Sequence, residues 1–149
     1  MNTRGRQGEN VERSGDTSTS QMSQHALALR FLTRTQSEVA QLRALLPNGA
    51  LPLEPVAVGH IERMAHHISS AAEAFGFIEL GAIAGAIELL ASIGATRSLR
   101  ERLELSARLK AQIAALNAHV QHEINERNVQ EEAASPMSAH LPGFGSRRS

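Results

Sequence analysis

The fold is decided by residues 58–76, which read VGHIERMAHHISSAAEAFG. Apolar residues recur in this stretch at alternating intervals of three and four, which is the spacing of one stripe along an α-helix. The members of the stripe are Val58, Ile61, Ala65, Ile68, Ala72 and Phe75. A stripe this narrow suits the core of a helical bundle. Gly76 is typical of the left-handed residue that follows a helix, so the stretch predicts a helix with one buried face that closes at Gly76.

His66 lies well off this stripe, because successive residues of a helix are turned by about 100°. The sequence therefore places His66 toward solvent. The residues around it on the helical wheel are small or acidic, and none is bulky and apolar: Gly59, Glu62, Ser69, Ser70 and Glu73. An unprotonated imidazole is a ready nucleophile toward phosphorus, and a partner surface could reach this one.

The chain resembles histidine-containing phosphotransfer (HPt) domains in the run AHHISS at residues 65–70 and in the Phe75-Gly76 pair and Leu80 that follow. The family's pattern there is roughly Ala-His-x-Leu-Lys-Gly, then a hydrophobic-Gly pair and a Leu. In this alignment His66 matches the phosphorylated position. Two residues depart from the pattern, since Ser69 stands where the family usually has Lys and Ser70 where it usually has Gly.

This resemblance implies a carrier that relays a phosphoryl group between receiver-domain aspartates in a two-component phosphorelay, on His66. Its partners would be the receiver domains of response regulators and a hybrid histidine kinase. They would dock on Gly59, Glu62, Ser69, Ser70 and Glu73. The receiver would supply magnesium and most catalytic groups, so no cofactor is expected on this chain. A kinase activity of its own is not expected, because the sequence has no Gly-rich phosphate loop and no Walker-type lysine.

The departures from the family pattern leave alternatives open. Ser69 offers a hydroxyl where a Lys would offer positive charge, and Glu62 and Glu73 repel a phosphoryl group, so we expect a less stable phosphorylated form. A degenerate HPt-like module that docks receivers without phosphotransfer is therefore the alternative, and a helical scaffold without histidine chemistry is a third. His67 is a competing nucleophile, but the spacing to Gly76 favours His66.

The rest of the chain predicts three further helices and no strand. One amphipathic helix runs from His25 to just before Pro47, and Pro55 suits the first turn of the helix that carries His66. A third helix runs from Ile78 to near Gly94. The last runs from about Ser98 to Arg127, where Ser98 and Glu101 form a capping-box signature. Short connections between four helices predict an all-α, antiparallel four-helix bundle.

The two ends of the chain are polar and predict disordered tails, because such segments bury too little surface to offset the entropy of ordering. The predicted organisation is a tail at residues 1–23, an HPt-like bundle at residues 24–128 and a second tail at residues 129–149.

Composition narrows the classes of function. Lys plus Arg and Asp plus Glu both number 15, so net charge predicts neither nucleic-acid nor membrane binding. The chain has no Cys, which excludes disulfides and thiolate chemistry. The pairs His60 with His67 and His119 with His122 share helix faces, but without supporting ligands we interpret them as solvated and expect no metal site. We expect a cytoplasmic monomer, since no signal segment or long apolar stretch is present.

Overall fold

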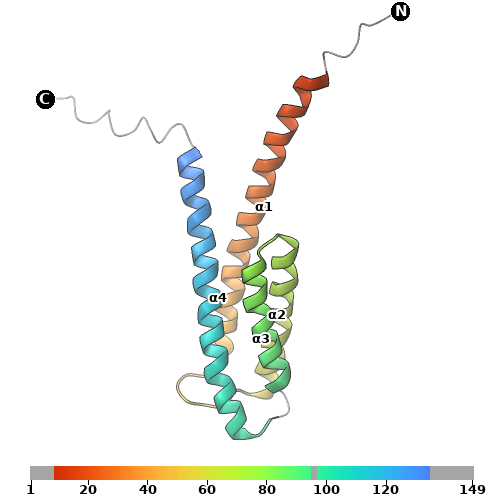
Figure 1. Ribbon diagram of the computed structural model, residues 1–149. Helices are drawn as coiled ribbons and strands as arrows, with labels where there is room; N and C mark the ends of the chain where they lie inside the picture. The colour runs from red at the N-terminus through yellow and green to blue at the C-terminus, as the bar shows by residue number, and fades with distance from the viewer. Residues whose placement is uncertain (1–8, 95–96, 135–149) are drawn as a thin grey trace, which may run out of the picture.

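The computed structural model describes residues 9–94 and 97–134. Within them the chain forms four helices and no strand: α1 (Glu9–Leu45), α2 (Pro55–Ala74), α3 (Ile78–Gly94) and α4 (Leu99–Ala134). Successive helices run in opposite directions, and each contacts its two neighbours around a closed ring (Figure 1). The predicted all-α, antiparallel four-helix bundle is confirmed. In the described residues no helix is long and apolar enough to cross a membrane.

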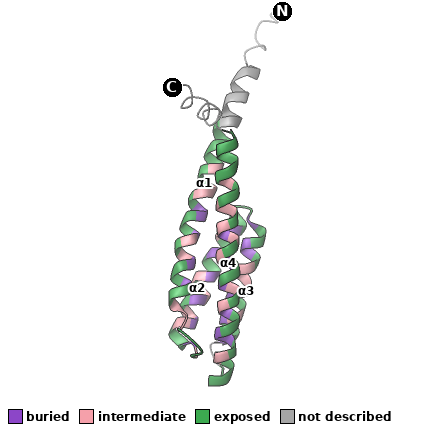
Figure 2. Cartoon of the chain, turned by 90° about the vertical axis from the view of Figure 1, so that its left-hand side faces the viewer, coloured by how far each residue is buried: buried purple, intermediate pink, exposed green. Residues whose placement is uncertain are grey.

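All four helices contribute residues to one core. Figure 2 shows the buried residues recurring along the helices between exposed ones. The largest fully buried side chains include Leu32 and Leu42 of α1, Ile61 and Ile68 of α2, Leu80 and Ile87 of α3, and Leu109, Ile113 and Leu116 of α4. Burying a side chain of this size contributes about 1.5–3 kcal/mol, so the shared core holds the helices in place. The core thereby fixes which face of α2 is left to solvent.

The apolar stripe of α2 is buried as predicted, except at its last member. Its first five members, from Val58 to Ala72, are all fully buried. Phe75 is 45 % exposed, so its assignment to the core was wrong. The helix ends at Ala74, and Phe75 caps it with a ring that stacks on Phe31 at a centroid distance of 4.8 Å. The chain then turns and buries Phe77 instead.

The ends of α2 follow the sequence signals. Pro55 stands in the first turn, where its missing N–H costs no hydrogen bond. At the other end Gly76 has φ +80°, the left-handed conformation that Gly adopts without strain. The N–H of Gly76 donates to the carbonyl of Glu73 (3.0 Å), and that of Phe77 donates to the carbonyl of Ala72 (2.8 Å). These two bonds form a Schellman motif, which turns the chain tightly into α3.

The first and last helices, α1 and α4, are longer than the sequence predicted. α1 begins at Glu9 rather than near His25, and α4 continues to Ala134 rather than ending near Arg127. The structure therefore differs from the predicted tails over residues 9–23 and 129–134, while residues 1–8 and 135–149 lie outside the described residues. The described side chains of residues 19–24 and 128–134 are exposed. A helix that is already nucleated extends through polar residues by local hydrogen bonds, so a lack of burial does not predict a lack of helix.

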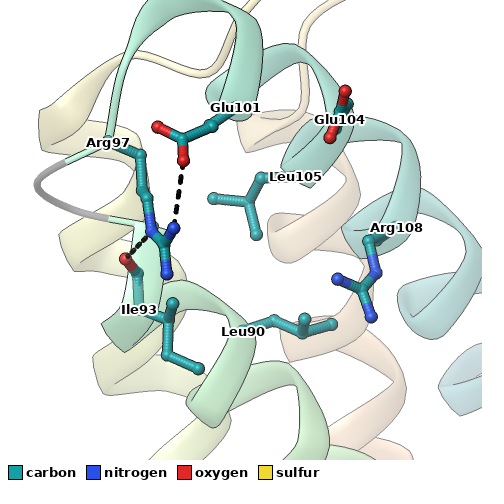
Figure 3. Close-up of a pocket in the computed structure, with 8 residues that line it drawn as sticks. Leu90, Ile93, Arg97, Glu101, Glu104, Leu105 and Arg108 are labelled. Atoms are coloured by element: carbon teal, nitrogen blue, oxygen red, sulfur yellow. Dashed lines mark hydrogen bonds and ion pairs between the residues drawn. The ribbon is translucent and has the colours of Figure 1, made fainter.

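The start of α4 is held by the predicted capping box. The N–H of Ser98 donates to Oε2 of Glu101 (2.9 Å), and the N–H of Glu101 donates to Oγ of Ser98 (3.4 Å). Arg97 joins them to α3, since it donates to Oε1 of Glu101 (3.0 Å) and to the carbonyl of Ile93 (3.3 Å) (Figure 3). The hydroxyl and the N–H of Ser98, followed by Arg97, lower the pKa of Glu101 to about 2.

Candidate functional site

His66 projects from the middle of α2, and its side chain is 67 % exposed. Its Nδ1 lies 2.9 Å from Oε1 of Glu88, which comes from α3. A carboxylate only accepts hydrogen bonds, so this contact favours the tautomer that carries its proton on Nδ1. The lone pair of Nε2 is then free, and Nε2 lies on the part of the ring away from Glu88.

Glu88 reaches His66 because α2 and α3 approach closely. A Cβ added at Gly81 would lie 3.4 Å from Cγ of Glu73 and 3.5 Å from the carbonyl oxygen of Ser69, and one at Gly85 would lie 3.5 Å from Oγ of Ser69. Small residues therefore line the face of α3 that meets α2. Glu88 continues that row three residues after Gly85.

Sequence reasoning missed Glu88 as a site residue. It lies 22 residues from His66 in the chain, so a wheel drawn for one helix cannot bring the two together. A signal was present nonetheless. The spacing of Gly81, Gly85 and Glu88 by four and three residues marks one helical face of small residues that ends in an acid.

The predicted docking residues all lie on α2, around His66. Ser70 and Glu73 are exposed, and Gly59, Glu62 and Ser69 are half-buried. Ser69 is engaged with the neighbouring helix, because its Oγ donates to the carbonyl of Gly81 at 3.0 Å. The hydroxyl that was expected to face a phosphoryl group thus ties α2 to α3.

His67 lies on the other side of α2, where it faces α1. Its Nδ1 is 3.7 Å from Oε1 of Glu38, and the same oxygen accepts a hydrogen bond from Nε of Arg34 at 3.2 Å. The two histidines therefore differ in their partners. His66 has a hydrogen-bonded carboxylate, whereas His67 faces a carboxylate that an arginine already holds.

A groove runs along the seam of α1 and α2 beside His67. Its apolar lining includes Leu27, Phe31, Ala71 and Phe75. Two of these side chains are substantially exposed, at 52 % for Leu27 and 45 % for Phe75. The groove offers apolar contact area to a partner that covers α2.

Both histidine pairs have other polar neighbours in the structure. Nδ1 of His60 lies 3.1 Å from Nη2 of Arg63, a cation that disfavours a metal ion at that nitrogen. His119 and His122 have ring centroids 6.5 Å apart, and Nε2 of His119 lies 3.7 Å from Glu123 and 3.8 Å from Glu79. Among the side chains that the structure describes, no group of three His, Cys, Asp or Glu is placed to hold a metal ion.

The family model described as "Hpt domain" matches residues 26–119, which is more than half of the chain. Comparison with curated proteins and comparison with solved structures gave no match. The match takes in residues 26–45 of α1, the whole of α2 and α3, and residues 99–119 of α4. Hpt domains are phosphocarriers of two-component signalling that interact with receiver domains, rather than kinases. The exposed His66 on a rigid helical bundle and the match of the family model lead to one conclusion: the chain belongs to the Hpt domain family.

Proposed function

We propose that this protein relays a phosphoryl group between receiver-domain aspartates and carries it on Nε2 of His66. The observation that carries this proposal is the 2.9 Å contact between Nδ1 of His66 and Oε1 of Glu88. This contact supports a proton on Nδ1, which would leave the lone pair of Nε2 available to a partner. A carrier needs such a group on a rigid helix, because orientation removes part of the entropic barrier to reaction.

The transfer is a displacement at phosphorus. Nε2 of His66 attacks the phosphorus of an aspartyl phosphate, the N–P bond forms, and the P–O bond to the aspartate breaks. The aspartate leaves as a carboxylate with both electrons of that bond. The proton on Nδ1 stays in place, so the ring becomes cationic while it faces the carboxylate of Glu88. Opposite charges at hydrogen-bond distance favour this product, and the reverse steps return the phosphoryl group to another aspartate.

The partners in this proposal are the receiver domains of response regulators and of a hybrid histidine kinase. The receiver supplies the magnesium ion and the catalytic groups that surround its aspartate. It docks over the outer face of α2, on Gly59, Glu62, Ser69, Ser70 and Glu73. The neighbouring groove extends this surface with Leu27 and Phe75, whose exposed area provides the apolar contact that docking requires.

A second candidate function is docking without transfer. It is favoured by the charges around His66, since Glu62, Glu73 and Glu88 are acidic and Ser69 is bonded to α3. A phosphoryl group adds about two negative charges, which these carboxylates repel. A protein of this kind would occupy receiver domains and compete with other carriers.

The test uses purified full-length protein and a panel of receiver domains, each labelled on its aspartate by a small phosphodonor. The proposal expects label to move to this protein as an acid-labile, base-stable adduct. His66→Gln should abolish the label, and His67→Gln is the matched control that should retain it.

Three results decide between the candidates. Transfer that disappears only in His66→Gln supports the carrier. Binding to a receiver without transfer supports the docking module and overturns the carrier. Transfer that survives His66→Gln and disappears in His67→Gln would show that His67 carries the phosphoryl group. That result would overturn the assignment of His66.

A further inference from the structure

The surface around His66 is unbalanced in charge. Glu88 touches the ring, Glu62 lies one turn before it on α2, and Glu73 lies two turns after it. Phosphorylation adds about two negative charges on the phosphoryl oxygens and one positive charge on the ring, so this face becomes more negative. A cation beside the phosphoryl oxygens would therefore stabilise the phosphorylated form.

Position 69, where the family usually has Lys, cannot supply that cation. Oγ of Ser69 donates to the carbonyl of Gly81 (3.0 Å), and it also lies 3.5 Å from where a Cβ on Gly85 would be. This side of α2 is closed by α3. A compensating charge has to come from the side of α2 that faces solvent.

Arg63 is an arginine on the solvent-facing side of α2. It is exposed and lies three residues before His66, so the two side chains project from the same face of α2 on successive turns. In the structure its Nη2 is 3.1 Å from Nδ1 of His60. None of the ion pairs among the described residues involves Arg63. Its charge is thus not neutralised by a neighbouring carboxylate.

We propose that Arg63 leaves His60 and binds the phosphoryl group when His66 is phosphorylated. This inference rests on the proposed function, because it assigns the residue that stabilises the phosphorylated state of the same site. A guanidinium gives two parallel hydrogen bonds to phosphoryl oxygens, and such charge-assisted bonds are stronger than a bond to an imidazole nitrogen. Nε2 lies on the part of the ring away from Glu88, which leaves the phosphoryl group open to Arg63.

The test does not need a receiver domain. Phosphoramidate transfers its phosphoryl group to an exposed imidazole: its P–N bond breaks, ammonia leaves, and a new N–P bond forms on the ring. The wild type, Arg63→Gln and Arg63→Lys are phosphorylated in this way, with Arg34→Gln as the matched control. Arg34 is an exposed arginine of the same surface, but Glu38 holds it at 3.2 Å. Phosphorus NMR then follows the titration of the phosphoryl group.

The expected result is a pKa of the phosphoryl group that rises by about 0.5 to 1 pH unit in Arg63→Gln, because a nearby cation favours the dianion. Arg63→Lys should recover part of the difference, and Arg34→Gln should match the wild type. Nitrogen NMR should also show that the Nε signal of Arg63 moves on phosphorylation while that of Arg34 does not.

Equal titration in the wild type and Arg63→Gln, with an unmoved Arg63 signal, would overturn this inference and leave the carrier function standing. Failure of every receiver to transfer, with the Arg63 effect intact, would overturn the carrier function and leave this inference standing. Failure of phosphoramidate to modify His66 would also overturn the inference about Arg63, because the phosphoryl group that Arg63 is proposed to bind would not form.

Discussion

Nδ1 of His66 lies 2.9 Å from Oε1 of Glu88, so a residue of α3 sets the orientation of the histidine on α2. The two side chains are 67 % and 34 % exposed, and water therefore weakens the pair. The main effect of the contact is on which tautomer of His66 is favoured. A carboxylate accepts, so the contact favours a proton on Nδ1, and the proposed function then uses Nε2 as the reacting nitrogen.

Glu88→Gln should slow phosphotransfer to His66 by about two- to fivefold, since an exposed pair contributes up to about 1 kcal/mol. The variant keeps the size of the side chain and removes the charge that faces the developing cationic ring. The rate of label transfer from a phosphorylated receiver measures this effect. Glu79→Gln is the matched control, because Glu79 is an exposed carboxylate of the same helix, α3, whose imidazole neighbour is His119. Equal slowing in both variants would contradict the role of the Glu88 contact.

Ser69→Ala should lower the free energy of unfolding by about 1 kcal/mol, because the bond from Oγ to the Gly81 carbonyl is lost in a half-buried place. Urea denaturation measures the change. Ser70→Ala provides the comparison, since Ser70 is exposed one residue further on and should change the free energy of unfolding by less than about 0.5 kcal/mol. Identical midpoints for the two variants would show that Ser69 does not tie α2 to α3.

Ile68→Val should lower the free energy of unfolding by about 1 kcal/mol, because Ile68 is fully buried on the core side of α2 and the change leaves a small cavity. The same substitution at Ile78, which is 77 % exposed, should cost less than about 0.5 kcal/mol. Thermal and urea unfolding of both variants compare the two positions. A larger loss at Ile78 would contradict the assignment of the core.

Glu101 should make the start of α4 sensitive to acid. Its pKa in the folded state is lowered to about 2, chiefly by the Ser98 hydroxyl. A lowered pKa means that the stabilisation is complete above the ordinary carboxyl range and is lost as pH falls from about 4.5 toward about 2. The melting temperature of the wild type should therefore exceed that of Glu101→Gln at pH 7, and the difference should shrink across that range. A difference that stays constant with pH would contradict the capping box, and Glu104→Gln serves as an exposed acidic control.

The architecture could be read from the sequence because each signal for it is local. The stripe from Val58 to Ala72, Pro55 at the start of α2 and Gly76 at its end act within one or two turns of helix. The burial of the last apolar residue in a stripe is harder to predict, because the helix can end one residue before it. Phe75 follows the end of α2 and is exposed, whereas Phe77 is buried in the core.

The site could be predicted only as far as α2 itself determines it. The exposure of His66 and the grouping of Glu62, Ser70 and Glu73 around it follow from one helical wheel. The partners of His66 and Ser69 on α3 depend on how closely two helices pack, which a single wheel does not contain. Small residues on α3 were the available indication of that close approach.

The most direct test of the account locates the phosphoryl group on the wild-type protein after transfer from a phosphorylated receiver. Nitrogen and phosphorus NMR of histidine-labelled protein, at neutral or basic pH, identify both the residue and the ring nitrogen. The account predicts one phosphoryl group on Nε2 of His66. A phosphoryl group on His67, or on Nδ1 of His66 in place of the contact with Glu88, would contradict it.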